Sequence, residues 1–500
     1  MHRFTAILIS GALASKLLGF AREILMAQLI GASLVADSFR SAITAIMLPL
    51  IFMHNESVPA ILIPMHRQSL KEGTGPQQLA ALTMALTGIA FLLMLFVQVL
   101  GVYWVDSVVH GFSSDGQALT LEFVRILALG MPASTMLNSL AAGEIALGRT
   151  RLTNIRASLL NVSVLMGIGL MALTGNVHIL AWSFTIAFNL LAGWGLISLS
   201  REGVLAFQGL TASSVLAAGL EFVRRLRPLL ALPLAEQGNM WIERFLASNL
   251  ATGAIASLDY ARTLTESSLL LFSQPIGLAV LSGNPQADLR SRILAIARPV
   301  LALACPASVF LFMFAPEIVR LVFHRGAFGD EAVLLTSQAL RGISFGLWAA
   351  TLGWILIRIL NGAGRNSLAA IIIVSGYAAN IVINLITSSF QTAGGAGVLL
   401  LGFGEAARGI VLLAAVAIVL ECKRVLVKLV ALALIPASCM GFLGWQIHEH
   451  FTGTIERLFA GGVAYLACIV IAAELLMPGT YGSLLLHVRK WWFRLSGSLR

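Results

Sequence analysis

The sequence alternates long apolar runs with short polar connections over its whole length. The runs are about 20 residues or longer, which is the length that an α-helix needs to cross a hydrocarbon core about 30 Å thick. Backbone amides inside a bilayer must be satisfied within their own segment, and the runs are too long for barrel strands, so the pattern predicts helices. We expect about fourteen transmembrane helices. The expected spans are residues 5–31, 37–65, 78–105, 119–147, 153–174, 177–199, 228–250, 263–284, 293–323, 334–361, 367–389, 397–421, 425–447 and 458–477.

The composition agrees with this pattern. Of the 500 residues, 58% are hydrophobic and 11% are charged, and the mean hydropathy is +0.89. A water-soluble protein of this size does not need so much apolar sequence for one core. The four cysteines are scattered and form no CxxC pair, so we expect no disulfide framework, no metal site and no cofactor. The sequence predicts an all-α polytopic membrane protein without a soluble domain.

The net charge of +10 is distributed unevenly along the chain. Connections after the even-numbered spans carry most of the basic residues, for example Arg67 with Lys71 and Arg149 with Arg151, whereas the intervening connections are mostly neutral or acidic. Cytoplasmic loops of membrane proteins are enriched in lysine and arginine. We therefore expect both termini in the cytoplasm, and the basic surplus indicates topology rather than nucleic-acid binding.

The chain contains an internal repeat. Two pairs of stretches align, "REILMAQLIGASLVADSF" (22–39) with "RFLASNLATGAIASLDYA" (244–261) and "ALGR" (146–149) with "GAGR" (362–365). The first pair matches Gly31 to Gly253 and Asp37 to Asp259 at an offset of 253 − 31 = 222, and the second has an offset of 365 − 149 = 216. The partners lie an even number of spans apart, so the halves share one orientation, as in transporters with parallel repeats. The repeat predicts two pseudo-symmetric six-helix lobes plus a C-terminal helix pair.

The repeat also gives the expected domain limits. They are 1–200 for the N-terminal lobe, 201–222 for a cytoplasmic linker, 223–421 for the C-terminal lobe, 422–478 for an accessory helix pair and 479–500 for a basic cytoplasmic tail. The first 16 residues have the features of a signal peptide, with Arg3 before a short apolar run. Because the first span has an internal copy, we expect it to be a structural helix that is not cleaved.

Charged residues interrupt the first span. At about 100° per residue, Ser15, Lys16, Arg22 and Glu23 share one face of about 120°. A charge at the bilayer centre costs roughly 2.5–3.5 kcal/mol, so this stripe predicts either a polar cavity or pairing between helices. Asp37 and Arg40 in the second span are the candidate partners.

A second charged cluster, "LDYARTLTE", begins the eighth span with Asp259, Arg262 and Glu266. Arg262 and Glu266 are spaced i, i+4 and have the geometry to bridge each other. Arginine presents a planar fork that matches phosphate oxygens. A large cavity lined by such residues is suited to a phosphate or pyrophosphate headgroup.

Four stretches carry a resemblance to a known family. They are "SKLLGFAREILMAQLIGASLVADSF" (15–39), "ASLLNVSVLMG" (157–167), "LDYARTL" (258–264) and "LVFHRGAFGDEAVLLTSQALRGISFGL" (321–347). The chain resembles the MurJ/MviN lipid II flippases of the multidrug/oligosaccharidyl-lipid/polysaccharide exporter superfamily. The residues that match the family's cavity positions are Ser15, Lys16, Arg22, Glu23, Asp37, Arg262 and Glu266.

The resemblance implies a multi-pass flippase of the bacterial cytoplasmic (inner) membrane. Such a protein moves an undecaprenyl-pyrophosphate-linked saccharide, lipid II, from the inner to the outer leaflet by alternating access. The implied partners are the lipid-linked saccharide, the bilayer, and candidate cell-wall or polysaccharide synthesis enzymes. The resemblance implies a transporter and not an enzyme.

The sequence departs from the family pattern at several of these positions. The family usually has arginine where Lys16 stands and aspartate where Glu23 stands, and lysine lacks the bidentate fork. A basic pair that usually follows a Leu-Pro is absent, and only His54 lies nearby. Ala261 replaces an acidic residue, and Glu266 lies one position further from Arg262 than expected. These differences leave another polyprenyl-linked glycan, of the exopolysaccharide or O-antigen type, as an alternative substrate.

Other functional classes fit less well. A drug or cation antiporter of the same superfamily would share the two lobes, but the cationic stripe repels organic cations. A membrane glycosyltransferase would need a substantial outer domain, whereas the outer loops are short. The GxxxxGK[ST] loop of an ATP-driven pump is absent. A non-transporting scaffold remains as the binding-protein alternative, and the "HEH" at 448–450 is interpreted as part of an interface loop.

Overall fold

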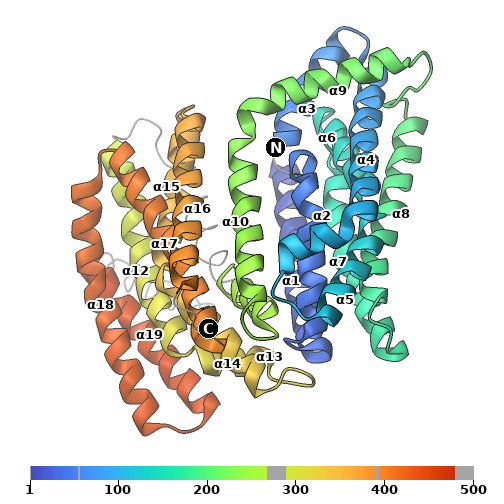
Figure 1. Cartoon of the computed structure of the whole chain (residues 1–500). Helices are drawn as coiled ribbons and strands as arrows, with labels where there is room; N and C mark the ends of the chain where they lie inside the picture. The colour runs from blue at the N-terminus through green and yellow to red at the C-terminus, as the bar shows by residue number, and fades with distance from the viewer. Residues whose placement is uncertain (1, 55–56, 267–288, 390–393, 479–500) are drawn as a thin grey trace, which may run out of the picture. The chain divides into compact units, whose positions relative to one another are not determined.

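The computed structural model describes residues 2–54, 57–266, 289–389 and 394–478. Within these ranges the chain is helical and contains no strand (Figure 1). The first helices are α1 (His2–Ile30), α2 (Leu34–His54), α3 (Ser57–Lys71), α4 (Gly75–Val109), α5 (Ser114–Ala128), α6 (Met131–Ala146), α7 (Arg151–Thr174), α8 (Ile179–Arg201), α9 (Ala212–Leu226) and α10 (Ala231–Ser248). A helix over 254–266 follows. The remaining helices are α12 (Leu289–Met313), α13 (Ala315–Phe323), α14 (Asp330–Phe345), α15 (Leu347–Gly362), α16 (Asn366–Ser388), α17 (Gly394–Val419), α18 (Lys423–His450) and α19 (Thr454–Leu476).

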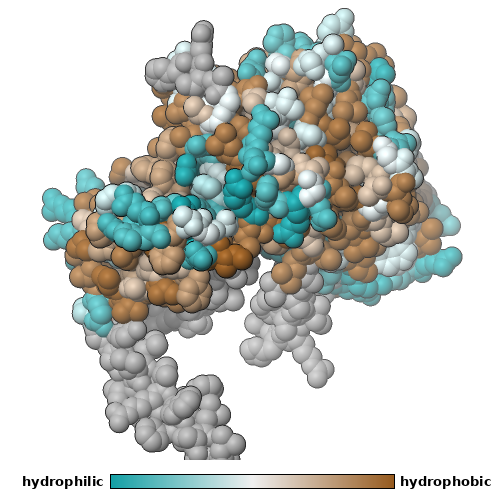
Figure 2. All heavy atoms as spheres, turned by 90° about the horizontal axis from the view of Figure 1, so that it is seen from below, coloured by the Kyte–Doolittle hydropathy of each residue, from teal (hydrophilic) through white to brown (hydrophobic). Residues whose placement is uncertain are grey.

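The polytopic membrane architecture is confirmed. Among the described residues, nine helices are long and apolar enough to cross a membrane, or up to eleven if each of two bent pairs is one span. Large apolar side chains such as Leu173 and Phe459 are 85% and 75% exposed, and hydrophobic residues cover much of the surface in Figure 2. The expected count of fourteen stays a prediction, because most of the span 263–284 lies outside the described residues, as does the basic tail 479–500.

The chain forms two compact units. Unit 1 contains Met1–Ala256 and the loop Arg325–Gly329, and unit 2 contains Ser257–His324 and Asp330–Arg500. In unit 1, α10 packs against α2 and α4, and α9 packs against α3 and α4. In unit 2, α18 and α19 pack against each other and against α12. The domain limits expected from the sequence stay predictions.

Two expected spans, 119–147 and 334–361, are broken rather than continuous. The first is divided into α5 and α6, which meet at 44°, and the second into α14 and α15, which meet at 50°. A glycine precedes the second helix in each case, Gly130 before α6 and Gly346 before α15. In the first break Pro132 follows, and proline cannot donate the amide that would continue the helix. In the second, a Cβ on Gly346 would lie 2.4 Å from the Ala406 Cα, so only glycine permits this approach to α17.

These breaks repeat the geometry of one half in the other. The breaks are separated by 346 − 130 = 216 residues, which is the offset of the "ALGR" and "GAGR" stretches. The helices after the breaks, α6 and α15, are each 16 residues long. The other aligned glycines also correspond, since Gly31 and Gly253 both have positive φ, 67° and 89°, a conformation that glycine adopts without strain. The two halves therefore share local geometry as well as sequence.

The accessory pair α18 and α19 is fixed to unit 2 by both packing and charge. Phe314, Met440 and Cys468 are each fully buried in one apolar cluster between these helices and the end of α12. The buried Glu317 carboxylate lies 3.0 Å from Arg457 Nη1 and 3.2 Å from His448 Nε2. The first histidine of the "HEH" stretch is therefore part of an ion-pair cluster between helices.

Candidate substrate-binding site

The charged stripe of α1 forms an ion-pair cluster inside unit 1. The Glu23 side chain is 7% exposed, and its two oxygens accept hydrogen bonds from Arg22 at 2.8 Å and from Arg40 at 2.5 Å. Arg22 Nη1 also donates to Asn161 Oδ1 of α7 at 3.2 Å. A buried carboxylate between two arginines is compensated, and it fixes the direction of both guanidinium groups. We call Arg22, Glu23, Arg40 and Asn161 the Glu23 cluster.

The Glu23 cluster is partly open to its surroundings. The Arg22 side chain is 27% exposed, whereas that of Arg40 is 9% exposed. Lys16 lies on the same helix and is exposed. The predicted stripe therefore places one partly exposed arginine and one exposed lysine on α1. Ser15 belongs to α1, but its side chain lies outside the described residues.

Asp37, which precedes Arg40 by one turn on α2, performs a structural task. Its carboxylate is 1% exposed and accepts hydrogen bonds from the backbone amides of Gly253 at 2.6 Å and Ala256 at 2.7 Å. These amides begin the helix over 254–266, where the first N–H groups have no partner within the helix. An acidic side chain there satisfies them and complements the helix dipole. Asp37 thus caps a helix that lies more than 200 residues further along the chain.

Arg262 belongs to a second cluster, in unit 2. Glu405 of α17 lies 2.9 Å from Arg262 Nη2 and 2.8 Å from Arg408 Nη2, and its side chain is 7% exposed. Asp259 lies 3.3 Å from Arg262 Nη1. The Arg408 guanidinium also lies over the Tyr377 ring, 5.2 Å from its centroid. We call Asp259, Arg262, Glu405 and Arg408 the Glu405 cluster. Glu266 is exposed at the last described turn of its helix.

The repeat does not predict these contacts. Arg244 is the sequence partner of Arg22, yet it is buried and donates to Thr44 Oγ1 at 3.3 Å and to the Ile255 carbonyl at 3.4 Å. His54, which stands near the missing basic pair, lies 3.1 Å from Ser134 Oγ of α6. Arg22 and its sequence partner Arg244 therefore make different contacts, whereas Arg40 and Arg262, which also align, each pair with a buried glutamate.

Some residues of the two clusters were not among the candidate substrate-binding residues from the sequence. Arg40, Glu405 and Arg408 carry the signal of a charge within an apolar span, but the sequence does not say which charges pair. Asn161 lies in the stretch "ASLLNVSVLMG" and has only the weaker signal of an amide among apolar residues.

A further ion-pair cluster lies at the end of α6, the start of α7 and the end of α8. The Glu144 side chain is fully buried and accepts hydrogen bonds from Arg151 Nε at 2.8 Å and from the Leu152 amide at 2.7 Å, so it caps α7. Arg151 also hydrogen bonds to Glu202 at 2.8 Å, and this contact lowers the pKa of the Glu202 carboxyl below its usual range. Arg151, which the sequence assigns to a cytoplasmic connection, therefore holds the ends of these helices together.

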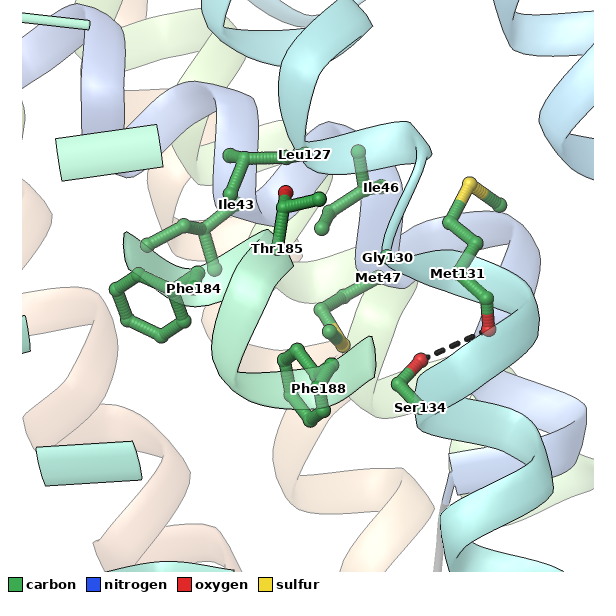
Figure 3. A pocket seen from close by; sticks show the side chains of 10 residues that line it. All are labelled: Ile43, Ile46, Met47, Leu127, Gly130, Met131, Ser134, Phe184, Thr185 and Phe188. Carbon is green, nitrogen blue, oxygen red and sulfur yellow. Dashed lines mark hydrogen bonds between the residues drawn. The ribbon is translucent and has the colours of Figure 1, made fainter. Parts of the chain in front are cut away.

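The small pocket beside the α5–α6 break is not suited to a charged headgroup. It has a volume of about 50 Å³ and is lined mainly by apolar side chains of α2, α6 and α8 (Figure 3). The Ser134 hydroxyl points to the Met131 carbonyl and donates to it at 2.9 Å. The pocket has room for only a few atoms, and no basic side chain lines it.

Comparisons with known proteins identify the family of the chain. The family described as "Lipid II flippase MurJ" matches residues 26–463. The lipid II flippase MurJ of Burkholderia cenocepacia is 28% identical over 380 residues, which cover 72% of each chain. The probable lipid II flippase MurJ of Buchnera aphidicola is 25% identical over 377 residues, with 70% of each chain covered.

Solved structures show the same fold. A lipid II flippase MurJ in an inward closed conformation has a TM-score of 0.79 at 16% identity and covers 95% of this chain and 100% of its own. An inward-facing multidrug resistance MATE family transporter has a TM-score of 0.59 at 12% identity, with 83% and 96% covered. The fold is therefore shared with both groups, whereas the family match extends over most of the sequence. The chain belongs to the lipid II flippase MurJ family.

Proposed function

We propose that this protein moves lipid II from the inner to the outer leaflet of the bacterial inner membrane by alternating access. Membership of the MurJ family supports a transporter role in peptidoglycan synthesis. The observation that carries the proposal is the partly exposed Arg22 guanidinium, which Glu23 and Asn161 orient on the charged face of α1, with exposed Lys16 on the same helix. Lipid II presents a pyrophosphate, and a desolvated, oriented arginine is a strong partner for phosphate oxygens.

In this mechanism Arg22 and Lys16 contact the pyrophosphate. Glu23 and Asn161 hold three nitrogens of the Arg22 guanidinium, so its orientation is fixed before substrate arrives. Arg40 supports the same carboxylate from a more buried position. An arginine that is already ordered loses less conformational entropy on binding than a flexible one. Ser15 is proposed to contact the headgroup from the same face of α1.

The second half contributes Arg262 and Glu266 in this proposal. Arg262 is oriented by Glu405 and Asp259, and its side chain is 15% exposed. Asp37 acts indirectly, because the helix that it caps carries both Arg262 and Glu266. The headgroup enters from the cytoplasmic side, the lobes rearrange, and the lipid tail stays in the bilayer. The cytoplasmic termini, the lobe limits and any synthesis enzymes as partners belong to the same proposal.

Complementation tests the proposal. The gene is expressed in bacteria depleted of their own lipid II flippase, and growth is scored for the wild type, Arg22→Ala and Lys428→Ala, an exposed residue of α18 that serves as control. We expect rescue by the wild type and by the control, and no rescue by Arg22→Ala at equal membrane expression. Rescue by Arg22→Ala would overturn the assignment of Arg22 as a substrate contact.

Another polyprenyl-linked glycan is the second candidate substrate. The observation that favours it is Lys16, where a point charge replaces the fork of an arginine. Failure of the wild type to rescue, despite normal membrane expression, would overturn lipid II as substrate. Rescue of a strain that lacks an exopolysaccharide or O-antigen flippase would then support the second candidate.

A further inference from the structure

An apolar groove lies between α9 and α4 in unit 1. It has a volume of about 770 Å³, within the range of roughly 300–1,000 Å³ that ligand pockets occupy. Its walls are residues 84–92 of α4 and 210–223 of α9, and Thr211 is the one polar side chain among those that line it. The groove therefore offers space for a hydrocarbon chain and little for a polar headgroup.

The sequence of α9 explains why this helix lies on the surface of unit 1. Thr211 and Ser214 form a capping box that starts the helix, and small residues allow it to cross α4 closely, since a Cβ on Gly219 would lie 3.1 Å from the Ala85 Cβ. In Figure 1, α9 runs across the end of unit 1 where α3 and α4 meet. The connection containing α9 is predicted to be cytoplasmic. Such a helix has the character of an amphipathic segment at the membrane interface.

The apolar face of α9 is not covered by the protein. Leu216 is 64% exposed, Leu220 is 61% exposed and Val223 is 39% exposed, and all three line the groove. On the opposite wall, Leu92 of α4 is 65% exposed. Bulk lipid would cover these residues in any membrane, so the apolar surface alone does not specify an occupant.

Two arginines at one end of the groove specify the occupant. Residues four apart lie on the same helix face, so Arg224 follows Leu220, and Arg227 follows Val223 at the end of the same apolar face. Both side chains are exposed, and Arg224 Nη1 lies 4.0 Å from Glu221 Oε2. Arg225 projects from the other side of the helix and is held by Glu221 at 2.6 Å. Arg225 compensates the one nearby carboxylate, so the groove ends in a net positive charge.

We propose that α4 and α9 form a binding site for an anionic glycerophospholipid of the inner leaflet, with one acyl chain in the groove and its phosphate at Arg224 and Arg227. Arginine binds phosphate oxygens with paired hydrogen bonds, and basic residues beside an apolar face attract anionic lipids. A zwitterionic lipid carries its own ammonium group and gains less from these arginines. The site is independent of the transported substrate, because it uses none of the residues in the Glu23 or Glu405 clusters.

Native mass spectrometry of the full-length protein tests this site. The purified protein in detergent is titrated with dioleoyl-phosphatidylglycerol and, separately, with dioleoyl-phosphatidylethanolamine. We expect phosphatidylglycerol to bind more tightly, and Arg224→Gln/Arg227→Gln to weaken it by about 20-fold, at about 5-fold for each arginine. The control, Lys428→Gln, removes an exposed basic charge from α18 in unit 2 and should retain the preference.

A second variant tests the groove without touching the charges. Gly88 lines the groove, and a Cβ built on it meets nothing within 4 Å, so Gly88→Leu fills the space without a backbone clash. We expect Gly88→Leu to weaken binding of both lipids, while Gly88→Ala leaves it nearly unchanged. Elution profile and thermal midpoint establish that each variant is folded. Equal affinity for the two lipids, an effect of Lys428→Gln as large as that of the double variant, or unaltered binding in Gly88→Leu would overturn the proposal.

Discussion

The two units each contain a buried glutamate between two arginines, but the surroundings of these glutamates differ. In the Glu23 cluster the Arg22 side chain is 27% exposed, and Lys16 stands exposed on the same helix. The Glu405 cluster includes Asp259 as a second carboxylate, so its two arginines are balanced. If the proposed function holds, we expect the headgroup to contact unit 1 mainly through Arg22 and Lys16 and unit 2 through Arg262.

The largest expected effect comes from removing the charge of each buried glutamate. Glu23→Gln leaves Arg22 and Arg40 without their shared counter-ion, and breaking a buried pair typically costs about 3–5 kcal/mol. Glu405→Gln should cost less, because the side chain of Arg408 is 30% exposed whereas that of Arg40 is 9% exposed. Thermal unfolding followed by tryptophan fluorescence in detergent measures both. A larger loss for Glu405→Gln would reverse the comparison.

The next effect separates binding from stability. Arg22→Ala should reduce transport by about 30-fold or more, because a charge-assisted contact to phosphate contributes about 2–3 kcal/mol. Arg408→Ala should reduce it by less than about 3-fold, because Arg262 still pairs with Glu405. A flipping assay in proteoliposomes with fluorescent lipid II compares the two. Equal losses would show that the clusters contribute alike to transport.

A smaller effect is expected at the helix cap. Asp37→Asn keeps one oxygen acceptor and loses the charge, so one of the amides of Gly253 and Ala256 loses its partner, at about 1–3 kcal/mol in the free energy of unfolding. Its sequence partner Asp259 is 17% exposed at its side chain, so Asp259→Asn should cost less than about 1 kcal/mol. Denaturation midpoints of the two variants provide the test. A midpoint of Asp37→Asn equal to that of the wild type would contradict the capping role.

The smallest effect is expected for Lys16→Arg. Because Lys16 is exposed, the substitution should change the free energy of unfolding by no more than about 0.5 kcal/mol. An arginine offers the phosphate a bidentate fork, so transport of lipid II should rise, by about 2-fold. The same flipping assay measures this change. A fall in transport would indicate that Lys16 fits a different headgroup and would favour the second candidate substrate.

Much of the fold could be predicted from the sequence. Hydropathy gave the helical membrane architecture, because a bilayer admits few other solutions for an apolar chain. The breaks at Gly130 and Gly346 were not predicted. Both positions lie within apolar runs of ordinary length, and the second break depends on a close approach to Ala406 that hydropathy does not register.

The candidate site was predictable in part. The spacing of Lys16, Arg22 and Glu23 identified a charged face, because a charge is costly in an apolar span. Arg40 was one of two candidate partners of this face, but the sequence did not select it over Asp37, since pairing depends on how α1 and α2 meet. Asp37 was a candidate for the site, but the structure shows that it caps a distant helix. A carboxylate near a cationic stripe looks the same in the sequence whether it faces a ligand or caps a helix.

The repeated break has a consequence for how the two halves have diverged. From the break to the end of the following helix, α6 and α15 have the same number of residues, while few of their side chains match. The two copies therefore retain the number of residues between the bend and the end of the following helix. A single residue inserted into either helix would turn everything beyond it by about 100°. The length of these two helices is therefore more tightly constrained than their amino-acid composition. The side chains of each half could change as long as the helix length stayed the same.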